Sequence, residues 1–286
     1  MAEYIKVPAG VYDMVTRCME QEFPNHVAIR YVAEDGKTVV EKKYREYAQD
    51  IRRMTAYLKA EVPDIKGRRI VLLSRNCYEF CVASYGIILA GGVLVTLNQK
   101  KTWPELEYEI GLVEPSLILN DGIDYGCRDQ LVAAYGPILR PMDSFKDSEP
   151  AMDITNTRGH DDLMVLMFTS GSSGEPKGVP LTHHNILSNI SQCSSRITLA
   201  PQSRFLGSLP VFHCFGITIG LWYPMIGGYD MVTYPSPLEA KRLGALIKQY
   251  GISLVVTTPT FLRGFMKRCE PPSGKSSAPF RAKATA

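Results

Sequence analysis

The sequence predicts an α/β fold in which mostly parallel sheets are covered by helices. Two patterns predict it. Apolar runs of strand length alternate with helical patterns along the chain, and several of these runs are continuously apolar, as strands buried on both faces are. With 286 residues, 45% hydrophobic and 21% charged, the chain has ordinary globular composition and room for one large domain or two modest ones.

The first half begins with helical residues around a short hairpin, whose two strand-like runs meet at the turn signal Asp35-Gly36. Apolar residues then recur at spacings of three and four, which predicts an amphipathic helix over 44–62. Strands and helices alternate after it, with strands expected at 68–74, 93–98 and 116–121 and helices at 76–92 and 102–115.

Residues 143–161 are polar and lack periodicity, which predicts a connecting loop. A second alternating set follows, with strands expected at 163–170, 204–210, 229–235 and 252–259 and helices at 182–197, 237–251 and 260–269. The longest apolar region, 211–229, contains His213, Pro224 and four glycines. It is barely long enough to span a bilayer, so we expect a core segment, with peripheral membrane contact left open.

These elements suggest three parts of the chain. A first α/β subdomain covers 1–160 and a second covers 161–269. Residues 270–286 are rich in Pro, Ser, Ala and Lys without periodicity, which predicts a disordered tail.

Charge and cysteine content exclude some classes of function. The net charge of +3 comes from the last 16 residues, so residues 1–270 are neutral and a nucleic-acid partner is not indicated. The seven cysteines are odd in number, scattered and without a histidine at metal-ligand spacing, which favours a reduced, cytoplasmic compartment and buried thiols. The first ten residues, MAEYIKVPAG, show no signal peptide.

The stretch LMFTSGSSGEPKGVPLTHHN, 166–185, contains the candidate phosphate site. It joins an apolar strand to a helix that Thr182 is placed to cap. Its glycines allow close approach of a ligand, its backbone N–H groups and hydroxyls suit phosphate oxygens, and a lysine adds a mobile positive charge. The residues concerned are Thr169, Ser170, Gly171, Ser172, Ser173, Gly174 and Lys177. On composition alone, a solvated Ser/Gly linker remains an open alternative.

Two better-known loops do not fit this spacing. A Walker loop starts a helix at its lysine, but here Pro176 precedes Lys177 and biases Glu175 away from helical geometry. A nucleophile elbow needs G-x-S-x-G, whereas Gly171-Ser172-Ser173-Gly174 is one residue short. Neither a P-loop kinase nor an α/β-hydrolase is supported.

The string TSGSSGEPKGV resembles the signature of the AMP-forming acyl-activating enzymes, which include acyl-CoA synthetases, luciferases and peptide-synthetase adenylation domains. RRIVLLSRNCYEFCVASYGIILAGGVLVTLN is similar to an earlier family motif, and LPVFHCFGITIG to its F-H-x-x-G segment. The similarity covers about 11–269 and is greatest to fatty-acid ligases and acyl-acyl carrier protein synthetases.

The resemblance implies an acid–thiol ligase. Such enzymes join a carboxylic acid to ATP, release pyrophosphate, and pass the acyl group to coenzyme A or to a carrier-protein pantetheine. It implies that the seven loop residues cradle the β- and γ-phosphates with Mg²⁺, and that His213 lies beside the acyl-adenylate. Lys177 and His213 are therefore the candidate catalytic residues, and no protein metal site is expected. The expected partners are a fatty or other carboxylic acid and, as one of the two alternative acyl acceptors, acyl carrier protein.

Three histidines and a pair of glycines have alternative interpretations. Without the resemblance, His213 among aromatic residues would be read as packed core. Gly216 and Gly220 either open a groove for an apolar chain or allow close helix packing. His183 and His184 are expected in the first turn of a helix and not as metal ligands, because no third ligand is suggested.

The family's later motifs for adenine, ribose and the adenylation lysine do not occur in this sequence. The expectation is therefore a truncated N-terminal domain without the C-terminal lid domain, whose activity alone is doubtful. The alternative is a non-catalytic ATP- or acyl-binding fragment or an inactive remnant.

Overall fold

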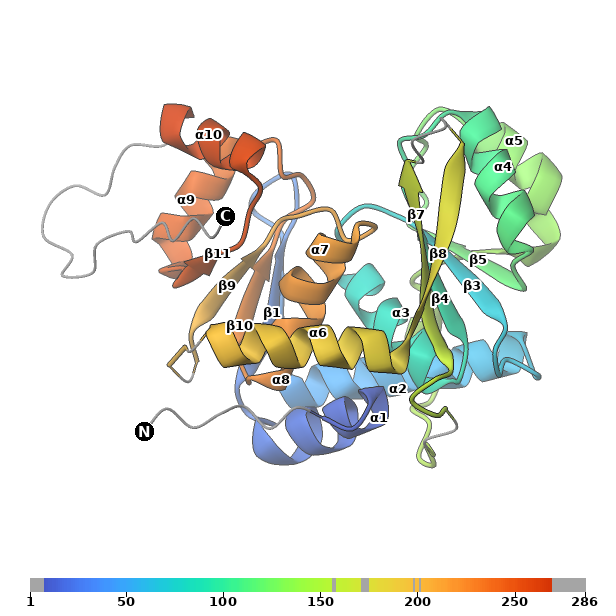
Figure 1. Cartoon of the computed structure of the whole chain (residues 1–286), viewed down its shortest axis with the longest axis horizontal. Coiled ribbons are helices and arrows are strands. Elements are labelled where there is room, and N and C mark those ends of the chain that lie inside the picture. The colour runs from blue at the N-terminus through green and yellow to red at the C-terminus, as the bar shows by residue number, and fades with distance from the viewer. Residues whose placement is uncertain (1–7, 156–157, 171–174, 198, 201, 269–286) are drawn as a thin grey trace, which may run out of the picture.

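The computed structural model describes residues 8–155, 158–170, 175–197, 199–200 and 202–268. Figure 1 shows two β-sheets side by side with helices between them and on their outer faces. The predicted α/β fold with mostly parallel sheets is confirmed, because among the described strands only the pairs β1–β2 and β7–β8 run antiparallel.

The first sheet, here sheet A, has the strand order β11-β9-β10-β1-β2. Its strands are β1 (Val27–Val32), β2 (Val39–Lys43), β9 (Arg204–Gly207), β10 (Asp230–Thr233) and β11 (Leu254–Val255). The antiparallel pair β1–β2 is the predicted hairpin at Asp35-Gly36, and Gly36 has the positive φ of 67° that such a turn requires.

The second sheet, sheet B, has the strand order β6-β5-β3-β4-β7-β8. Its strands are β3 (Arg69–Leu73), β4 (Val93–Leu97), β5 (Leu117–Asn120), β6 (Leu139–Pro141), β7 (Leu163–Ser170) and β8 (Pro176–Thr182). Five of these strands are parallel, so their carboxyl ends meet at one edge of the sheet.

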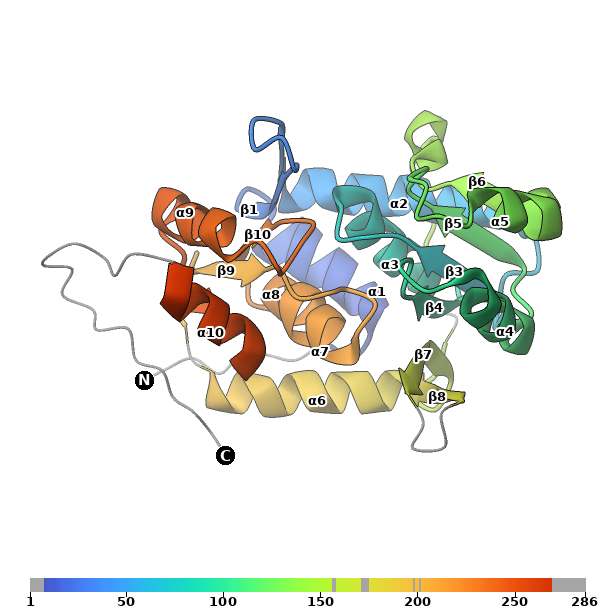
Figure 2. The ribbon, with the colours of Figure 1, turned by 90° about the horizontal axis from the view of Figure 1, so that it is seen from above.

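Helices form three layers around the two sheets. They are α1 (Val11–Asp13), the π-helical η1 (Met14–Glu22), α2 (Tyr44–Glu61), α3 (Tyr78–Leu89), α4 (Trp103–Val113), α5 (Arg128–Tyr135), η2 (Gly136–Ile138), η3 (Ser144–Asp147), α6 (His183–Arg196), α7 (Cys214–Ile217), the π-helical η4 (Thr218–Trp222), α8 (Tyr223–Ile226), α9 (Ala240–Tyr250) and α10 (Pro259–Arg268). Figure 2 shows α9 and α10 at one end of the molecule and α4 and α5 at the other.

Strand alternation explains this layering. In β3, Ile70 and Leu72 belong to the central core with α2 and α3, whereas Val71 and Leu73 pack with α4 and α5 on the outer face. Sheet A likewise packs α9 and α10 on its outer face. Side chains of a strand point alternately to opposite faces. A continuously apolar strand therefore contributes side chains both to the central core and to the core on the outer face of its sheet. The central helix α3 is buried at every residue except Glu79.

The boundary predicted at residue 160 does not separate the two sheets. Sheet A takes β1 and β2 from the first half of the chain, and sheet B takes β7 and β8 from the second half. The segment 211–229 forms α7, η4 and α8 and is mostly buried, which confirms that it is a core segment. No helix in the described ranges has the length and apolarity needed to cross a membrane.

The stretch after β7 differs from the loop that was predicted up to Thr182. Residues Pro176–Thr182 form β8, which pairs antiparallel with β7 at the edge of the sheet. Proline and glycine indicated a loop, but an edge strand tolerates proline because its outer N–H groups need no ladder partner. Lys177 therefore lies on a strand and not in a loop.

Candidate functional site

The described residues of the phosphate-loop motif, Thr169, Ser170 and Lys177, lie at the carboxyl edge of sheet B. In the β7–β8 pair, Thr169 lies opposite Lys177 and Ser170 lies opposite Pro176. The carboxyl edge of an open parallel sheet is the usual place for ligand binding in α/β proteins. The hairpin thus brings a hydroxyl residue and a lysine of the motif next to each other across two strands.

These motif residues face solvent. Thr169, Glu175 and Lys177 are exposed, and Lys177 makes no ion pair with any described residue. Its ammonium group is therefore available to an anionic ligand. Gly171, Ser172, Ser173 and Gly174 lie outside the described residues, so their predicted part in the cradle stays a prediction.

His213 caps the short helix α7 and is exposed. Its Nδ1 accepts a hydrogen bond from the Phe215 backbone N–H at 3.4 Å and lies 3.7 Å from the Cys214 Sγ. Because Nδ1 accepts, the neutral ring carries its proton on Nε2. The packed core histidine, expected when the residue is read alone, is not what the structure shows.

Two buried side chains, Asn76 after β3 and Thr96 of β4, bond to the segment that leads to His213. The Asn76 amide donates to the Leu209 carbonyl at 2.9 Å and accepts from the Val211 N–H at 3.0 Å. The Thr96 hydroxyl donates to the Phe212 carbonyl at 3.1 Å. Thr96 lies opposite Met167 of β7, two residues before Thr169, so β4 connects both predicted motifs.

Asn76 and Thr96 were not predicted as site residues. Asn76 stands within a stretch that resembles a family motif, but its bonding partners lie 133 and 135 residues further along the chain. No local pattern in the sequence marks such a contact.

Gly216 allows close packing and does not open a groove. A Cβ placed on it would lie 2.0 Å from the Pro210 carbonyl oxygen, so only glycine fits there. Gly220 lies close to Gly207 of β9, because a Cβ placed on Gly207 would lie 3.0 Å from the Gly220 carbonyl oxygen. Of the two alternatives given for these glycines, the structure supports packing of α7 and η4 against the segment 207–210.

His183 and His184 are the first two residues of α6, after the cap Thr182, as predicted. His183 is buried, and burial together with the nearby Arg158 charge lowers its pKa to about 4. His184 is exposed. Among the described residues no group of three His, Cys, Asp or Glu side chains could hold a metal ion.

The protein side chains available near the motif decide which kind of magnesium site fits the chain. Mg²⁺ in nucleotide sites keeps several waters and binds mainly through phosphate oxygens and one or two protein groups. A Mg²⁺ ion carried by the phosphates therefore fits the exposed hairpin, whereas a site built from three or more protein ligands does not fit the part of the chain that is described. The six cysteines in that part are free thiols, four of them buried.

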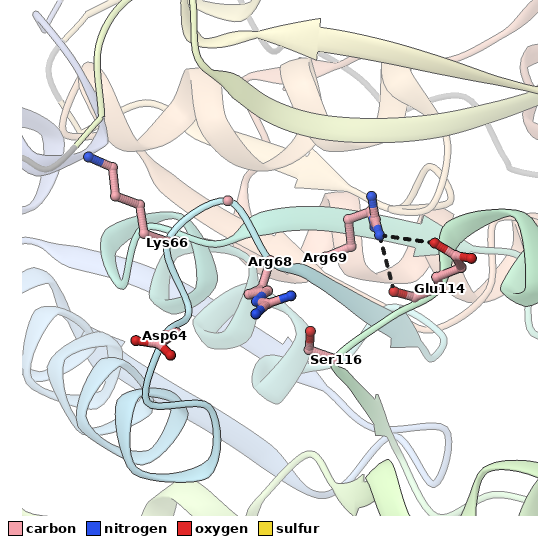
Figure 3. A pocket seen from close by; sticks show the side chains of 7 residues that line it. Asp64, Lys66, Arg68, Arg69, Glu114 and Ser116 are labelled. Atoms are coloured by element: carbon pink, nitrogen blue, oxygen red, sulfur yellow. Dashed lines mark hydrogen bonds and ion pairs between the residues drawn. The ribbon is translucent and has the colours of Figure 1, made fainter.

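A separate open pocket of about 520 Å³ lies at the opposite, amino-terminal edge of sheet B (Figure 3). Its lining consists of Asp64, Lys66, Gly67, Arg68, Arg69, Glu114 and Ser116. Arg69 donates to the Glu114 carbonyl at 3.4 Å, at the end of α4. Basic side chains are favoured at helix C-termini, where carbonyl groups are unpaired. The position of Arg69 in this pocket is thus explained by the end of α4.

Comparison with known proteins places these features in context. The sequence profile of the AMP-binding enzyme family matches residues 17–283. The match continues through residue 283, so it does not support the expectation that the similarity to the family ends at residue 269.

Curated relatives are acyl-CoA ligases. The chain is 26% identical over 290 residues to a long-chain-fatty-acid–CoA ligase of Bacillus subtilis, covering 87% of this chain and 50% of the relative. It is 27% identical over 215 residues to the long-chain-fatty-acid–CoA ligase FadD13 of Mycobacterium tuberculosis, covering 71% and 41%. The chain therefore spans about half the length of the curated relatives it matches.

Solved structures show the same fold. The inhibitor-bound N-terminal domain of FACL13 from Mycobacterium tuberculosis is similar with a TM-score of 0.79 and 26% identity, over 91% of this chain and 65% of that one. The o-succinylbenzoate CoA synthetase of Bacillus subtilis, in complex with its acyl-adenylate intermediate, has a TM-score of 0.77 at 22% identity, over 89% and 50%.

Proposed function

Because this chain belongs to the AMP-binding enzyme family, we propose that it forms part of an AMP-forming acid–thiol ligase that activates a fatty acid with ATP. The observation that carries the proposal is the β7–β8 hairpin, which sets Lys177 opposite Thr169 at the carboxyl edge of sheet B, with both side chains exposed. An exposed lysine beside hydroxyl groups on an antiparallel hairpin is suited to grip a polyphosphate.

The hairpin has one task in the reaction. A carboxylate attacks the α-phosphate of ATP, and the acyl-adenylate and pyrophosphate form. Both reactants are anionic, so the charge of the leaving pyrophosphate has to be neutralised. Lys177 supplies one positive charge and the Thr169 hydroxyl one donor, and Mg²⁺ bound to the phosphates supplies the remaining neutralisation when it is present.

His213 serves the acid end of the site in this proposal. It is exposed, its Nδ1 is engaged by the Phe215 N–H, and Nε2–H is left as a donor for a substrate oxygen. The segment that carries it is bonded to Asn76, which follows β3, and to Thr96 of β4, the strand that pairs with β7. Both ends of the site therefore rest on one sheet edge.

The fatty acid and coenzyme A are proposed from the relatives. Two of them are long-chain-fatty-acid–CoA ligases, and others are a probable 4-coumarate–CoA ligase of Dictyostelium discoideum and a feruloyl-CoA synthase of Amycolatopsis. A carrier-protein pantetheine as acceptor, peripheral membrane contact and a cytoplasmic location stay predictions from the sequence.

Pyrophosphate release tests the function. The chain is incubated with ATP, Mg²⁺ and a panel of fatty and aromatic acids, and pyrophosphate is measured with and without each acid. Acid-dependent release that Lys177→Gln abolishes supports the ligase. Binding of pyrophosphate without acid-dependent release supports the alternative, a non-catalytic binding protein, and absence of both contradicts the proposed site.

A further inference from the structure

Both polar groups of the Asn76 side chain form hydrogen bonds to one segment that is distant in the sequence. It is only 3% exposed, its amide nitrogen donates to the Leu209 carbonyl at 2.9 Å, and its amide oxygen accepts from the Val211 N–H at 3.0 Å. A two-point bond of this kind restrains a backbone in both position and orientation. Asn76 follows β3, whereas its partners follow β9 of the other sheet, so the contact joins the carboxyl edges of the two sheets.

Thr96 adds a third bond to the same segment. It is 2% exposed, and its hydroxyl donates to the Phe212 carbonyl at 3.1 Å. Thr96 lies in β4, opposite Met167 of β7. Thr169 is two residues further along the same strand β7. The segment is therefore attached to the strand beside the one that carries the phosphate loop.

The segment continues without a gap into His213. The His213 N–H donates to the Pro210 carbonyl at 3.1 Å, and the Ile217 N–H donates to the His213 carbonyl at 3.0 Å. The first turn of α7 also packs on this segment, because Gly216 allows contact with the Pro210 carbonyl. A displacement of residues 209–212 would move His213 with it.

We propose that Asn76 and Thr96 act as positioning residues, a clamp that sets His213 relative to Thr169 and Lys177 of the β7–β8 pair. This inference rests on the proposed function for the role of His213, but not for the clamp itself. Loss of one buried bond frees the segment, and the population of the working His213 position falls. The expected effect is on the order of tenfold in binding at the acid end, because one neutral bond and one unpaired buried group are involved.

The clamp is tested with Asn76→Ala and Thr96→Val. Thr96→Val removes only a hydroxyl and keeps the shape of the side chain, so it serves even if Asn76→Ala folds poorly. Thr55→Val is the matched control: Thr55 is also buried, and its hydroxyl donates to the Ile51 carbonyl at 2.8 Å within α2. Amide hydrogen exchange over 209–217, affinity for hexadecanoate and affinity for inorganic pyrophosphate are measured for each.

The expected result is selective. Exchange over 209–217 speeds up in Asn76→Ala and Thr96→Val but not in Thr55→Val, hexadecanoate binding weakens about tenfold, and pyrophosphate binding stays within about twofold. Unchanged exchange in both variants overturns the clamp, and so does an equal loss of both affinities, which indicates general destabilisation. If the unmutated chain binds no hexadecanoate, the proposed acid site fails while the exchange result still decides the clamp.

Discussion

Lys177 and His183 lie six residues apart in the sequence but in opposite environments. Lys177 is exposed on the edge strand β8, whereas His183 is buried at the start of α6. Lys177 is therefore accessible to a ligand, whereas burial favours the uncharged form of His183 in the folded chain. Each environment leads to a measurable expectation.

Lys177→Gln should weaken pyrophosphate binding roughly 10- to 100-fold, because a charge-assisted bond to phosphate is lost. Isothermal titration calorimetry of pyrophosphate measures it. Lys59→Gln, which removes an exposed lysine of α2, should leave the affinity unchanged. Equal affinities of the two variants would remove Lys177 from the phosphate site.

His183 should make the chain less stable as the pH falls below about 6.5. Burial lowers its folded-state pKa from 6.5 to about 4, so between these values the unfolded chain binds a proton that the folded chain does not. Urea unfolding should show a loss of roughly 2 kcal/mol from this group between pH 7 and 5.

The neighbouring histidine provides the control for that measurement. His183→Gln should flatten the pH dependence, whereas His184→Gln, at an exposed position, should keep it. A pH dependence that is the same in His183→Gln as in the unmutated chain would contradict the assignment.

Among the elements, α7 and α4 each contain a glycine with a different role. Gly216 of α7 faces the Pro210 carbonyl, and a Cβ there would lie 2.0 Å from that oxygen. Gly111 of α4 has nothing within 4 Å of the same position. The two glycines form a matched pair for testing how α7 packs.

Gly216→Ala should lower the free energy of unfolding by about 1–3 kcal/mol, since the segment 209–212 has to shift. Gly111→Ala should raise it by up to about 1 kcal/mol, because alanine is the better helix former. Urea unfolding of both variants measures the difference. Similar values for the two would show that α7 does not depend on close approach at Gly216.

Elements with strong periodicity could be predicted, and weakly patterned ones could not. The helices α2 and α3 and the strands β3 and β4 lie within one or two residues of their expected ranges, except that α3 ends three residues early. The short α5 buries only Leu131, so it carries little amphipathic signal. Strand β8 was missed because its prolines and glycine indicate a loop when no partner strand is known.

The candidate site shows the same division. The phosphate loop is a prediction that the sequence allows because its residues are consecutive, and the structure adds only that Thr169 and Lys177 lie opposite each other. The bonds of Asn76 and Thr96 could not, because they depend on which strand ends meet, and that is decided by packing between distant parts of the chain.

At the scale of the whole molecule, the two sheets share both halves of the chain. The hairpin β1–β2 pairs with β10, and the hairpin β7–β8 pairs with β4. Neither 1–160 nor 161–286 contains a complete sheet, although the sequence alone suggested a boundary between them. Because each sheet needs strands from both halves, we expect the described fold to unfold as a single cooperative unit.

Separate expression of 1–160 and 161–286 should therefore give two polypeptides without fixed tertiary structure. Near-UV circular dichroism of each, compared with the complete chain, measures this. We expect the aromatic signal of the complete chain to be absent from both pieces, since β1 and β4 each lose a neighbouring strand. A cooperative thermal transition in either piece alone would show that the halves fold independently.

The placement of β1 beside β10 has a consequence for biosynthesis. Arg30 of β1 forms an ion pair with Asp230 of β10, and the two residues are 200 positions apart. At ribosomal rates of about 5–20 residues per second, the first hairpin emerges roughly 10–40 s before its partner strand exists. During that interval its open edge is exposed to other nascent chains. The yield of folded protein in cells should accordingly depend on chaperones that shield this hairpin until translation has reached β10.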